Sequence, residues 1–231
     1  MSCKIIGHRG SPRVELENTY ESFLVAANLD IFGIETDFTE LNDKSLLIFH
    51  DDTLTRLAGI EKNVRELTKD NFKEIILKSE NFEKEYHICD IISYLEICKK
   101  FEKTPVIDLK WGFSEQSVEY MVNLLKEMNM LEKTIVICYT KETVYYIAEN
   151  HKDLKLQYLV GSLFSEEVVN DCLRLNIGID LRHDLVTKEL VDLFHEHNLE
   201  VNCWTVDNDE DIQRVKELGV DYITTNYPNK K

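Results

Sequence analysis

Basic residues are scarce in this sequence. It has 27 Lys and Arg against 43 Asp and Glu, which gives a formal net charge of -16 at pH 7. A surface with this balance repels nucleic acid and anionic lipid, so we expect no nucleic-acid partner and no stable association with a membrane. A local cationic pocket is compatible with the overall charge.

Long apolar runs are absent as well. No segment is apolar over the length that a membrane-spanning helix needs. The start, MSCKIIGHRG, enters a strand-like run directly, without the basic segment and apolar stretch of a signal peptide. These absences predict a cytoplasmic protein.

The six cysteines include no CxxC pair and lie mostly inside apolar segments. Buried, reduced thiols are the interpretation we favour over a disulfide or zinc framework. The residues concerned are Cys3, Cys89, Cys98, Cys138, Cys172 and Cys203.

No tract rich in Gly, Pro or Ser interrupts the chain, so we expect one domain over residues 1–231. Eight strand-like cores can be identified: Ile5–Ile6, Ile34–Phe38, Val106–Leu109, Ile135–Cys138, Leu156–Val160, Ile177–Leu181, Val201–Trp204 and Tyr222–Thr224. Amphipathic runs with helical spacing separate most of them: Thr19–Leu29, Ser114–Met128, Lys141–Asn150, Ser165–Leu175, Thr187–His197 and Asn208–Leu218. Ser114, Ser165 and Thr187 are candidate N-caps.

An eightfold alternation of strand and helix predicts an α/β fold, a closed (β/α)8 or TIM barrel. The gap between the second and third strands is far longer than the others. We therefore expect a small insertion at about 53–89, after the second strand and its hairpin. The helical spacing of Thr68–Leu77 predicts that this insertion is mainly helical, and Asp90–Phe101 is expected to be the barrel helix before the third strand.

Active sites of such barrels lie at the carboxyl ends of the strands. Polar residues occupy those positions here: His8 and Arg9 after the first strand, Glu35 and Asp37 on the second, Asp108 and Lys110 on the third, and Trp204 on the seventh. We expect these side chains to meet at one rim of the barrel.

The segment Gly33–Asp52 brings a second histidine to the same place. Asn42–Ser45 is polar and indicates a turn, and Leu46–Phe49 is expected to return as a strand. A hairpin symmetric about that turn pairs residues whose numbers sum to about 87, which sets His50 opposite Asp37. The alternative is that the alternating acids form a solvated strand face.

Three carboxylates form a hard oxygen site, which suits Mg²⁺ or Ca²⁺. Glu35, Asp37 and Asp108 are the predicted ligands of one divalent cation, because acids packed so closely repel one another without a cation. Arg9 and Lys110 beside them would bind an anion such as a phosphate.

His8 and His50 on either side of that phosphate can act as a general acid and base pair, in either order. The predicted reaction is metal-assisted hydrolysis of a phosphodiester.

The ordered motifs IIGHRG, LENTYESF, IETDFT, LIFHDDTLTR, VIDLK, VNCWTVDN and GVDYITTNYP extend from Ile5 to Pro228. Together they make the chain similar to the glycerophosphodiester phosphodiesterases. The resemblance implies a TIM barrel, a divalent metal, and hydrolysis of small-molecule glycerophosphodiesters to glycerol 3-phosphate and an alcohol. It also implies catalytic roles for His8 and His50, metal ligation by Glu35 and Asp37, substrate contacts by Arg9, Lys110 and Trp204, and an orienting or binding role for Glu17.

Two positions depart from the family pattern. Asp108 occupies a ligand position that is commonly Glu, and Asp43-Lys44 replaces the usual Asp-Gly of the hairpin turn. Three alternatives stay open: a phospholipase-C-like enzyme, a lysophospholipase-D-like enzyme, and a metal-binding module without turnover. Retention of both histidines argues against the last, because metal binding needs neither an acid nor a base.

Overall fold

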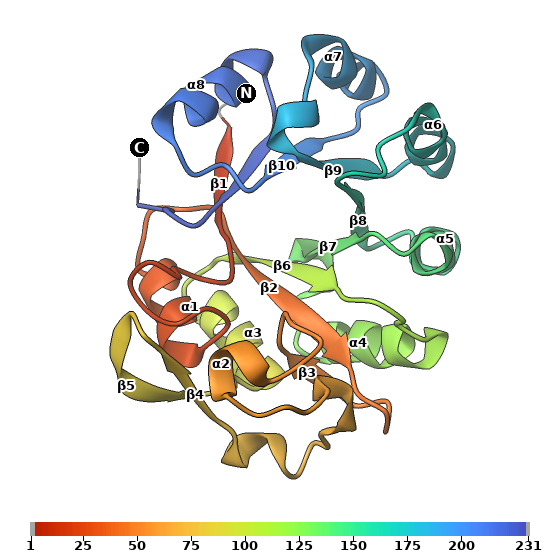
Figure 1. Cartoon of the computed structure of the whole chain (residues 1–231). Helices are drawn as coiled ribbons and strands as arrows, with labels where there is room; N and C mark the ends of the chain where they lie inside the picture. The colour runs from red at the N-terminus through yellow and green to blue at the C-terminus, as the bar shows by residue number, and fades with distance from the viewer. Residues whose placement is uncertain (1–2, 230–231) are drawn as a thin grey trace.

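A computed structural model describes residues 3–229 and contains the predicted barrel (Figure 1). Its eight parallel strands are β1 (Lys4–Gly7), β2 (Gly33–Glu40), β6 (Thr104–Leu109), β7 (Ile135–Cys138), β8 (Lys155–Val160), β9 (Gly178–Arg182), β10 (Val201–Trp204) and β11 (Tyr222–Thr225). The sheet closes because β1 pairs with both β11 and β2. Each strand coincides with one of the expected apolar cores, so the fold prediction is confirmed.

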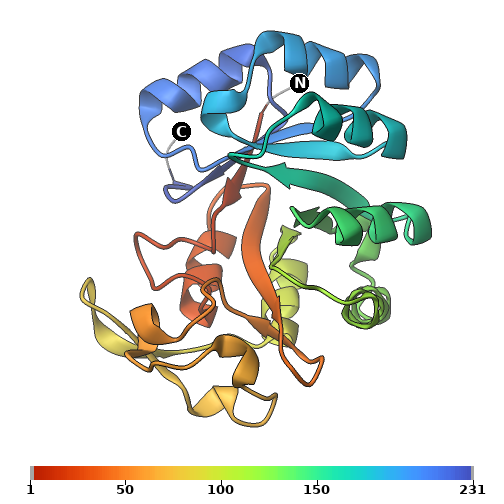
Figure 2. The ribbon, with the colours of Figure 1, turned by 45° about the vertical axis from the view of Figure 1, so that its right-hand side comes forward.

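Seven helices cover the outside of the barrel (Figures 1 and 2). They are α1 (Tyr20–Ala27), α3 (Ile91–Lys100), α4 (Glu115–Glu127), α5 (Lys141–Asn150), α6 (Glu166–Leu175), α7 (Lys188–Glu196) and α8 (Asp209–Leu218). The side chains of Ser114, Ser165 and Thr187 accept the hydrogen bonds that cap α4, α6 and α7, as predicted. Within residues 3–229, no helix is long and apolar enough to cross a membrane.

The inside of the barrel contains an apolar cluster and a polar group. Ile6, Val106, Ile135, Ile137 and Tyr222 form a buried apolar cluster. Strands β8 to β11 also supply a buried polar group: Gln157, Asp180, Asn202 and Thr224. A larger apolar core lies between the strands and the surrounding helices.

The hairpin register differs from the prediction by one residue. β2 pairs with β3 (Leu46–Ile48) through Phe38–Ile48, Thr39–Leu47 and Glu40–Leu46, so the paired numbers sum to 86. The reason is the turn, in which the backbone N–H of Leu41 bonds the carbonyl of Ser45. The loop is therefore three residues long and Lys44 takes a φ of 68°. Phe49, not His50, lies opposite Asp37.

The insertion is not mainly helical, contrary to the prediction. It contains one short helix, α2 (Thr55–Ala58), two 3-10 turns, η1 (Val64–Glu66) and η2 (Phe72–Glu74), and a hairpin of β4 (Ile76–Ser79) and β5 (Phe82–His87). The segment Thr68–Leu77 forms only the turn η2 before it enters β4, because β5 supplies its hydrogen-bonding partner. Leu77 and Phe72 pack into a separate apolar cluster with Leu47 and Phe49 of the β2–β3 hairpin. The insertion is thus packed against the hairpin (Figure 2).

A buried hydrogen bond fixes β2, the strand that carries Glu35 and Asp37. The hydroxyl of Tyr94 on α3 donates to the carbonyl of Ile34 at 2.8 Å, and Tyr94 is fully buried. Its ring packs against Phe23 and Phe38. The helix, the strand and the adjacent helix α1 are thereby held in one arrangement.

We expect Tyr94→Phe to destabilise the fold by about 1–2 kcal/mol, because the carbonyl of Ile34 loses a donor in a buried position. For a chain of this length the melting temperature should fall by about 2–8 °C. Thermal unfolding followed by circular dichroism measures this. The control is Tyr120→Phe on the exposed face of α4, which should lie within about 0.5 kcal/mol of the wild type. Equal stability of the two variants would contradict a structural role for the Tyr94 hydroxyl.

Candidate active site

A cavity of about 490 Å³ opens at the carboxyl ends of the barrel strands. Eight of the nine predicted site residues line it: His8, Arg9, Glu35, Asp37, His50, Asp108, Lys110 and Trp204. Glu17 does not line the cavity and instead accepts hydrogen bonds from Arg9 and Arg56, so its role stays a prediction. The strands thus bring together side chains that are up to about 200 positions apart in the sequence.

The three acids form a compact buried cluster. Glu35, Asp37 and Asp108 each offer a carboxylate oxygen, and these oxygens lie within 4.8 Å of one another. Burial, followed by the charge of Asp37, raises the pKa of Glu35 well above its ordinary value. Burial also raises the pKa of Asp108 against the opposing effect of Lys110. The cluster therefore resists carrying three negative charges by itself.

Two cations compensate part of this charge. Nζ of Lys110 lies 3.1 Å from Oδ2 of Asp108 and 3.3 Å from Oδ1 of Asp37, and Nε of Arg9 lies 3.2 Å from Oδ2 of Asp37. Burial alone would raise the pKa of Asp37, but the charges of Arg9 and Lys110 outweigh it and hold that pKa below the ordinary value. Asp37 is therefore the acid that stays ionised.

The turn His8-Arg9-Gly10 places these groups. The backbone N–H of Arg9 donates to Oε2 of Glu35 at 2.7 Å, and its carbonyl accepts from the hydroxyl of Ser22 at 3.0 Å. Arg9 and Gly10 have φ angles of 52° and 88°. A Cβ on Gly10 would lie 2.5 Å from Oγ of Ser22, so only glycine fits there.

His8 is a half-buried, neutral imidazole. Its Nδ1 lies 2.8 Å from Oδ1 of Asn226, and the amide nitrogen of Asn226 donates to Asp207 at 2.7 Å. Asn226 therefore presents its oxygen to the ring, which places the His8 proton on Nδ1. Burial and the charge of Arg9 lower the pKa of His8 to about 4. Its Nε2, 3.9 Å from Oε2 of Glu35, is left as a free base at the cavity.

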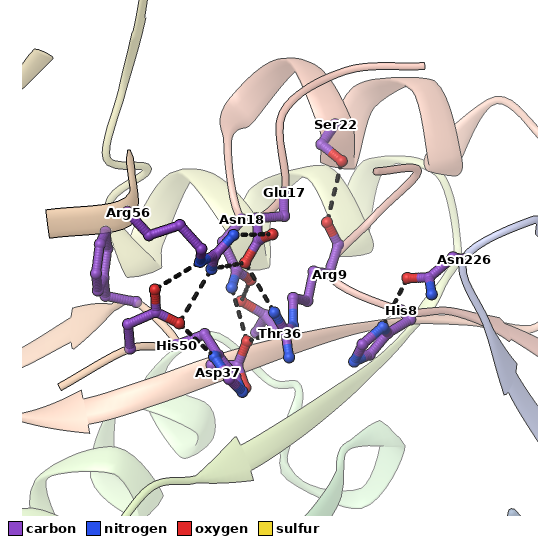
Figure 3. A network of polar contacts seen from close by, with 12 residues as sticks. His8, Arg9, Glu17, Asn18, Ser22, Thr36, Asp37, His50, Arg56 and Asn226 are labelled. Carbon is purple, nitrogen blue, oxygen red and sulfur yellow. Dashed lines mark hydrogen bonds and ion pairs between the residues drawn. The ribbon is translucent and has the colours of Figure 1, made fainter. Parts of the chain in front are cut away.

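His50 is oriented by a carboxylate. Its Nδ1 lies 2.7 Å from Oδ1 of Asp51, whose oxygens also accept from Arg56 at 2.7 and 3.0 Å. Arg56 donates in turn to Glu17 at 2.7 and 2.9 Å, and Glu17 accepts from Arg9 at 2.8 Å. Figure 3 shows this continuous network running from His50 to Arg9.

His50 reaches the site by a route that differs from the predicted one. The ring reaches the cavity from beyond the end of β3 and not through a pairing with Asp37. Several partners of the site residues were not predicted: Asn18, which donates to Asp37 at 2.7 Å, Asn226, Asp51 and Arg56. Asn18 lies in LENTYESF, and Asp51 and Arg56 lie in HDDTLTR, so the motifs contained the signal.

Asp180 was missed as well. It lines the cavity from β9 and is 1% exposed, and burial raises its pKa well above the ordinary value. A single acid in the middle of the apolar strand GIDLR is the signal that could have identified it.

The donor set fits a hard divalent cation. All three cluster residues offer oxygen, and Oδ1 of Asp108 is buried without a hydrogen-bond partner in the described structure. A buried acceptor of this kind costs free energy unless a ligand satisfies it. Mg²⁺ and Ca²⁺ are the cations that prefer such oxygen ligands.

Comparison with known proteins relates the chain to one family. The model of the glycerophosphoryl diester phosphodiesterase family matches residues 8–230. A glycerophosphodiester phosphodiesterase of Caldanaerobacter subterraneus subsp. tengcongensis is 27% identical over 240 residues, covering 99% of this chain and 96% of that protein.

Two solved structures share the fold. A phosphodiesterase of Oleispira antarctica in complex with the product sn-glycerol-3-phosphate superimposes with a TM-score of 0.87 at 18% identity, covering 99% and 94% of the two chains. A glycerophosphodiester phosphodiesterase of Thermotoga maritima gives a TM-score of 0.80 at 19% identity, with 99% and 96% covered.

We expect Mg²⁺ or Ca²⁺ to raise the melting temperature, because the cation binds the acid cluster of the folded state only. Saturation at 100 times the Kd corresponds to about 2.7 kcal/mol, or roughly 5–10 °C. The rise should be smaller at pH 5 than at pH 8. Glu35 and Asp108 have raised pKa values, so they hold more protons at low pH, and the cation must displace them.

Differential scanning fluorimetry at both pH values, with KCl at matched ionic strength as the control, measures this effect. In Asp108→Asn the shift should be much reduced. An equal shift in wild type and variant would place the cation elsewhere.

Proposed function

Because the chain belongs to the glycerophosphoryl diester phosphodiesterase family, we propose that it hydrolyses glycerophosphodiesters to glycerol 3-phosphate and an alcohol, with a divalent cation and a His8/His50 acid–base pair. One observation carries the proposal: the acid cluster, two cations and two imidazoles line a single cavity. The proposed location is the cytoplasm, as the sequence predicted.

Glu35, Asp37 and Asp108 would hold the cation, Mg²⁺ or Ca²⁺. When bound, it neutralises charge that grows on the phosphoryl oxygens and acidifies a hydroxyl near it. The chain's own residues then hold the substrate. Arg9 and Lys110 line the cavity beside the acids and would bind the phosphate oxygens, and Trp204 would pack against the carbon atoms of the substrate.

The hydrogen bonds of the two histidines support different roles. His8 is paired with a neutral amide, and its free Nε2 would accept the proton of the attacking water, whose oxygen forms the new bond to phosphorus. His50 is paired with the carboxylate of Asp51, which balances the charge of a protonated ring, so His50 would donate its proton to the leaving oxygen. The network through Arg56 and Glu17 keeps that carboxylate in place.

An enzyme of the lysophospholipase-D type is the second candidate. One wall of the cavity is apolar, formed by Ile137, Tyr158, Leu159, Leu163 and Val168, and could accommodate an acyl chain.

The proposal predicts release of glycerol 3-phosphate from glycerophosphocholine and glycerophosphoethanolamine, with loss of activity in a chelator.

In His50→Ala, kcat should fall by about 10²- to 10⁴-fold, because the leaving oxygen loses its proton donor. An enzymatic assay of glycerol 3-phosphate measures both. The matched control is His87→Ala on the exposed face of β5 in the insertion, which should keep full activity. Release without a metal, or an unimpaired His50→Ala, would overturn the mechanism; a folded, metal-binding protein without any turnover would leave the non-catalytic alternative.

Asp51→Asn should lower kcat by about 10- to 100-fold with little change in KM, because the amide no longer orients and balances the protonated His50. Steady-state kinetics on glycerophosphocholine measure kcat and KM separately. Asp52→Asn, one residue along and exposed, serves as the control. A change confined to KM would assign Asp51 to substrate binding instead.

A further inference from the structure

Asp180 is a buried acid that the proposed mechanism does not use. It lies on the interior side of β9, is 1% exposed and lines the cavity. Within the described structure, neither of its carboxyl oxygens has a hydrogen-bond partner. Buried polar groups are nearly always paired, and an unpaired one costs free energy, so this residue calls for a ligand.

The neighbouring polar residues do not supply that partner. The amide of Asn202 donates to Oε1 of Gln157 at 3.2 Å, and the hydroxyl of Thr224 donates to Oδ1 of Asn202 at 3.5 Å. This small chain crosses the interior of the barrel without including Asp180. A purely structural buried acid would be expected to join it.

Asp180 lies deeper in the cavity than Trp204. In the sheet, Asp180 is paired with Asn202. Trp204 is paired with Arg182, two residues closer to the carboxyl ends of the strands. The indole N–H of Trp204 donates to the backbone carbonyl of Asp180 at 3.4 Å. The edge of the ring lies 3.6 Å from the Cβ position of Gly161, so it extends over this side of the cavity. The deep end therefore has an aromatic wall and a carboxyl group.

A neutral hydroxyl is the ligand that fits this position. Asp180 is outside the acid cluster whose oxygens lie close enough to share a cation. An ammonium group or a phosphate would have to give up its hydration to reach a residue this buried, and burial favours the uncharged form of Asp180, which offers neither ion a counter-charge. A hydroxyl bears no charge and donates the hydrogen bond that the carboxyl oxygen lacks.

We propose that Asp180 binds a hydroxyl of the substrate's glycerol moiety and so selects diesters with free glycerol hydroxyls over lysophospholipids. This inference rests on the proposed function and specifies its substrate class. The short glycerol group reaches the deep end with its carbon atoms against Trp204, and the longer alcohol extends toward the cavity mouth.

Acylation of the glycerol would remove this fit. An acyl ester has no donor for Asp180 and brings an apolar chain against a buried carboxyl group. A site built to bind a hydroxyl rejects analogues that lack it much more strongly than an apolar pocket rejects a difference in size.

Equilibrium binding to the Mg²⁺-saturated protein tests the role of Asp180 without turnover. Isothermal titration calorimetry compares sn-glycerol 3-phosphate with inorganic phosphate for wild type, Asp180→Ala and Asp180→Asn. We expect Asp180→Ala to raise the Kd of glycerol 3-phosphate by about 10-fold or more, while the Kd of phosphate stays within about twofold of the wild-type value. Asp180→Asn, which keeps an acceptor oxygen, should recover most of the loss.

The control variant is Gln157→Met. Gln157 is another buried interior residue with an unpaired polar atom, Nε2, but it does not line the cavity. The Gln157→Met substitution should leave the Kd of both ligands unchanged to within about twofold. Equal weakening of both ligands in Asp180→Ala, or no weakening of either, would overturn the proposal.

Choline release then tests the selectivity. Wild type should prefer glycerophosphocholine to 1-acyl-glycerophosphocholine by about 100-fold or more in kcat/KM, and Asp180→Ala should narrow that ratio by about 10-fold or more. Equal kcat/KM values for the two substrates in the wild type, or the same ratio of kcat/KM in Asp180→Ala as in the wild type, would overturn the proposed role of Asp180 in selectivity. Release from neither substrate would refute the proposed function, and the binding comparison would still decide whether Asp180 contacts glycerol.

Discussion

Three carboxylates held within 4.8 Å of one another in a buried space are the constraint on which the site depends. Like charges so close in low dielectric cannot all persist without compensation. Arg9 and Lys110 supply part of it, and they favour ionisation of Asp37 while burial keeps Glu35 and Asp108 partly protonated. With all three acids ionised, the arrangement is one positive charge short of neutral, which is the electrostatic condition for binding a cation and, next to it, an anionic phosphate.

The same compensation ties together loops that are remote in the sequence. Arg9 forms ion pairs with Asp37 in the cluster and with Glu17 behind it. Glu17 also forms an ion pair with Arg56. Asp51 then links Arg56 to the imidazole of His50. The acid cluster and one of the two imidazoles are therefore positioned by one ion-pair network, so that the charge of the site also determines its geometry (Figure 3).

The barrel strands and their rim residues could be predicted because continuous apolar runs and the carboxyl-end rule depend on local pattern alone. The hairpin register could not, since it depended on whether Ser45 belongs to the turn or to the pair with Leu41. The strand β4 was mistaken for helix because its partner β5 lies several residues further along and only tertiary pairing decides between the two. Asp51 and Asp180 were missed because one polar residue has no periodicity, and its importance follows from what it contacts or fails to contact.

The presence or absence of contacts separates two kinds of buried acid in this barrel. Asp37 has partners on both oxygens, so its burial stabilises a defined arrangement of strand and cations. Asp180 has none, and its burial lowers the stability of the fold by itself. A protein retains such a group without structural benefit when a ligand provides the missing contact. Asp180 and Thr224 therefore extend the substrate cavity into the polar part of the barrel interior, whereas Gln157 and Asn202 do not line it.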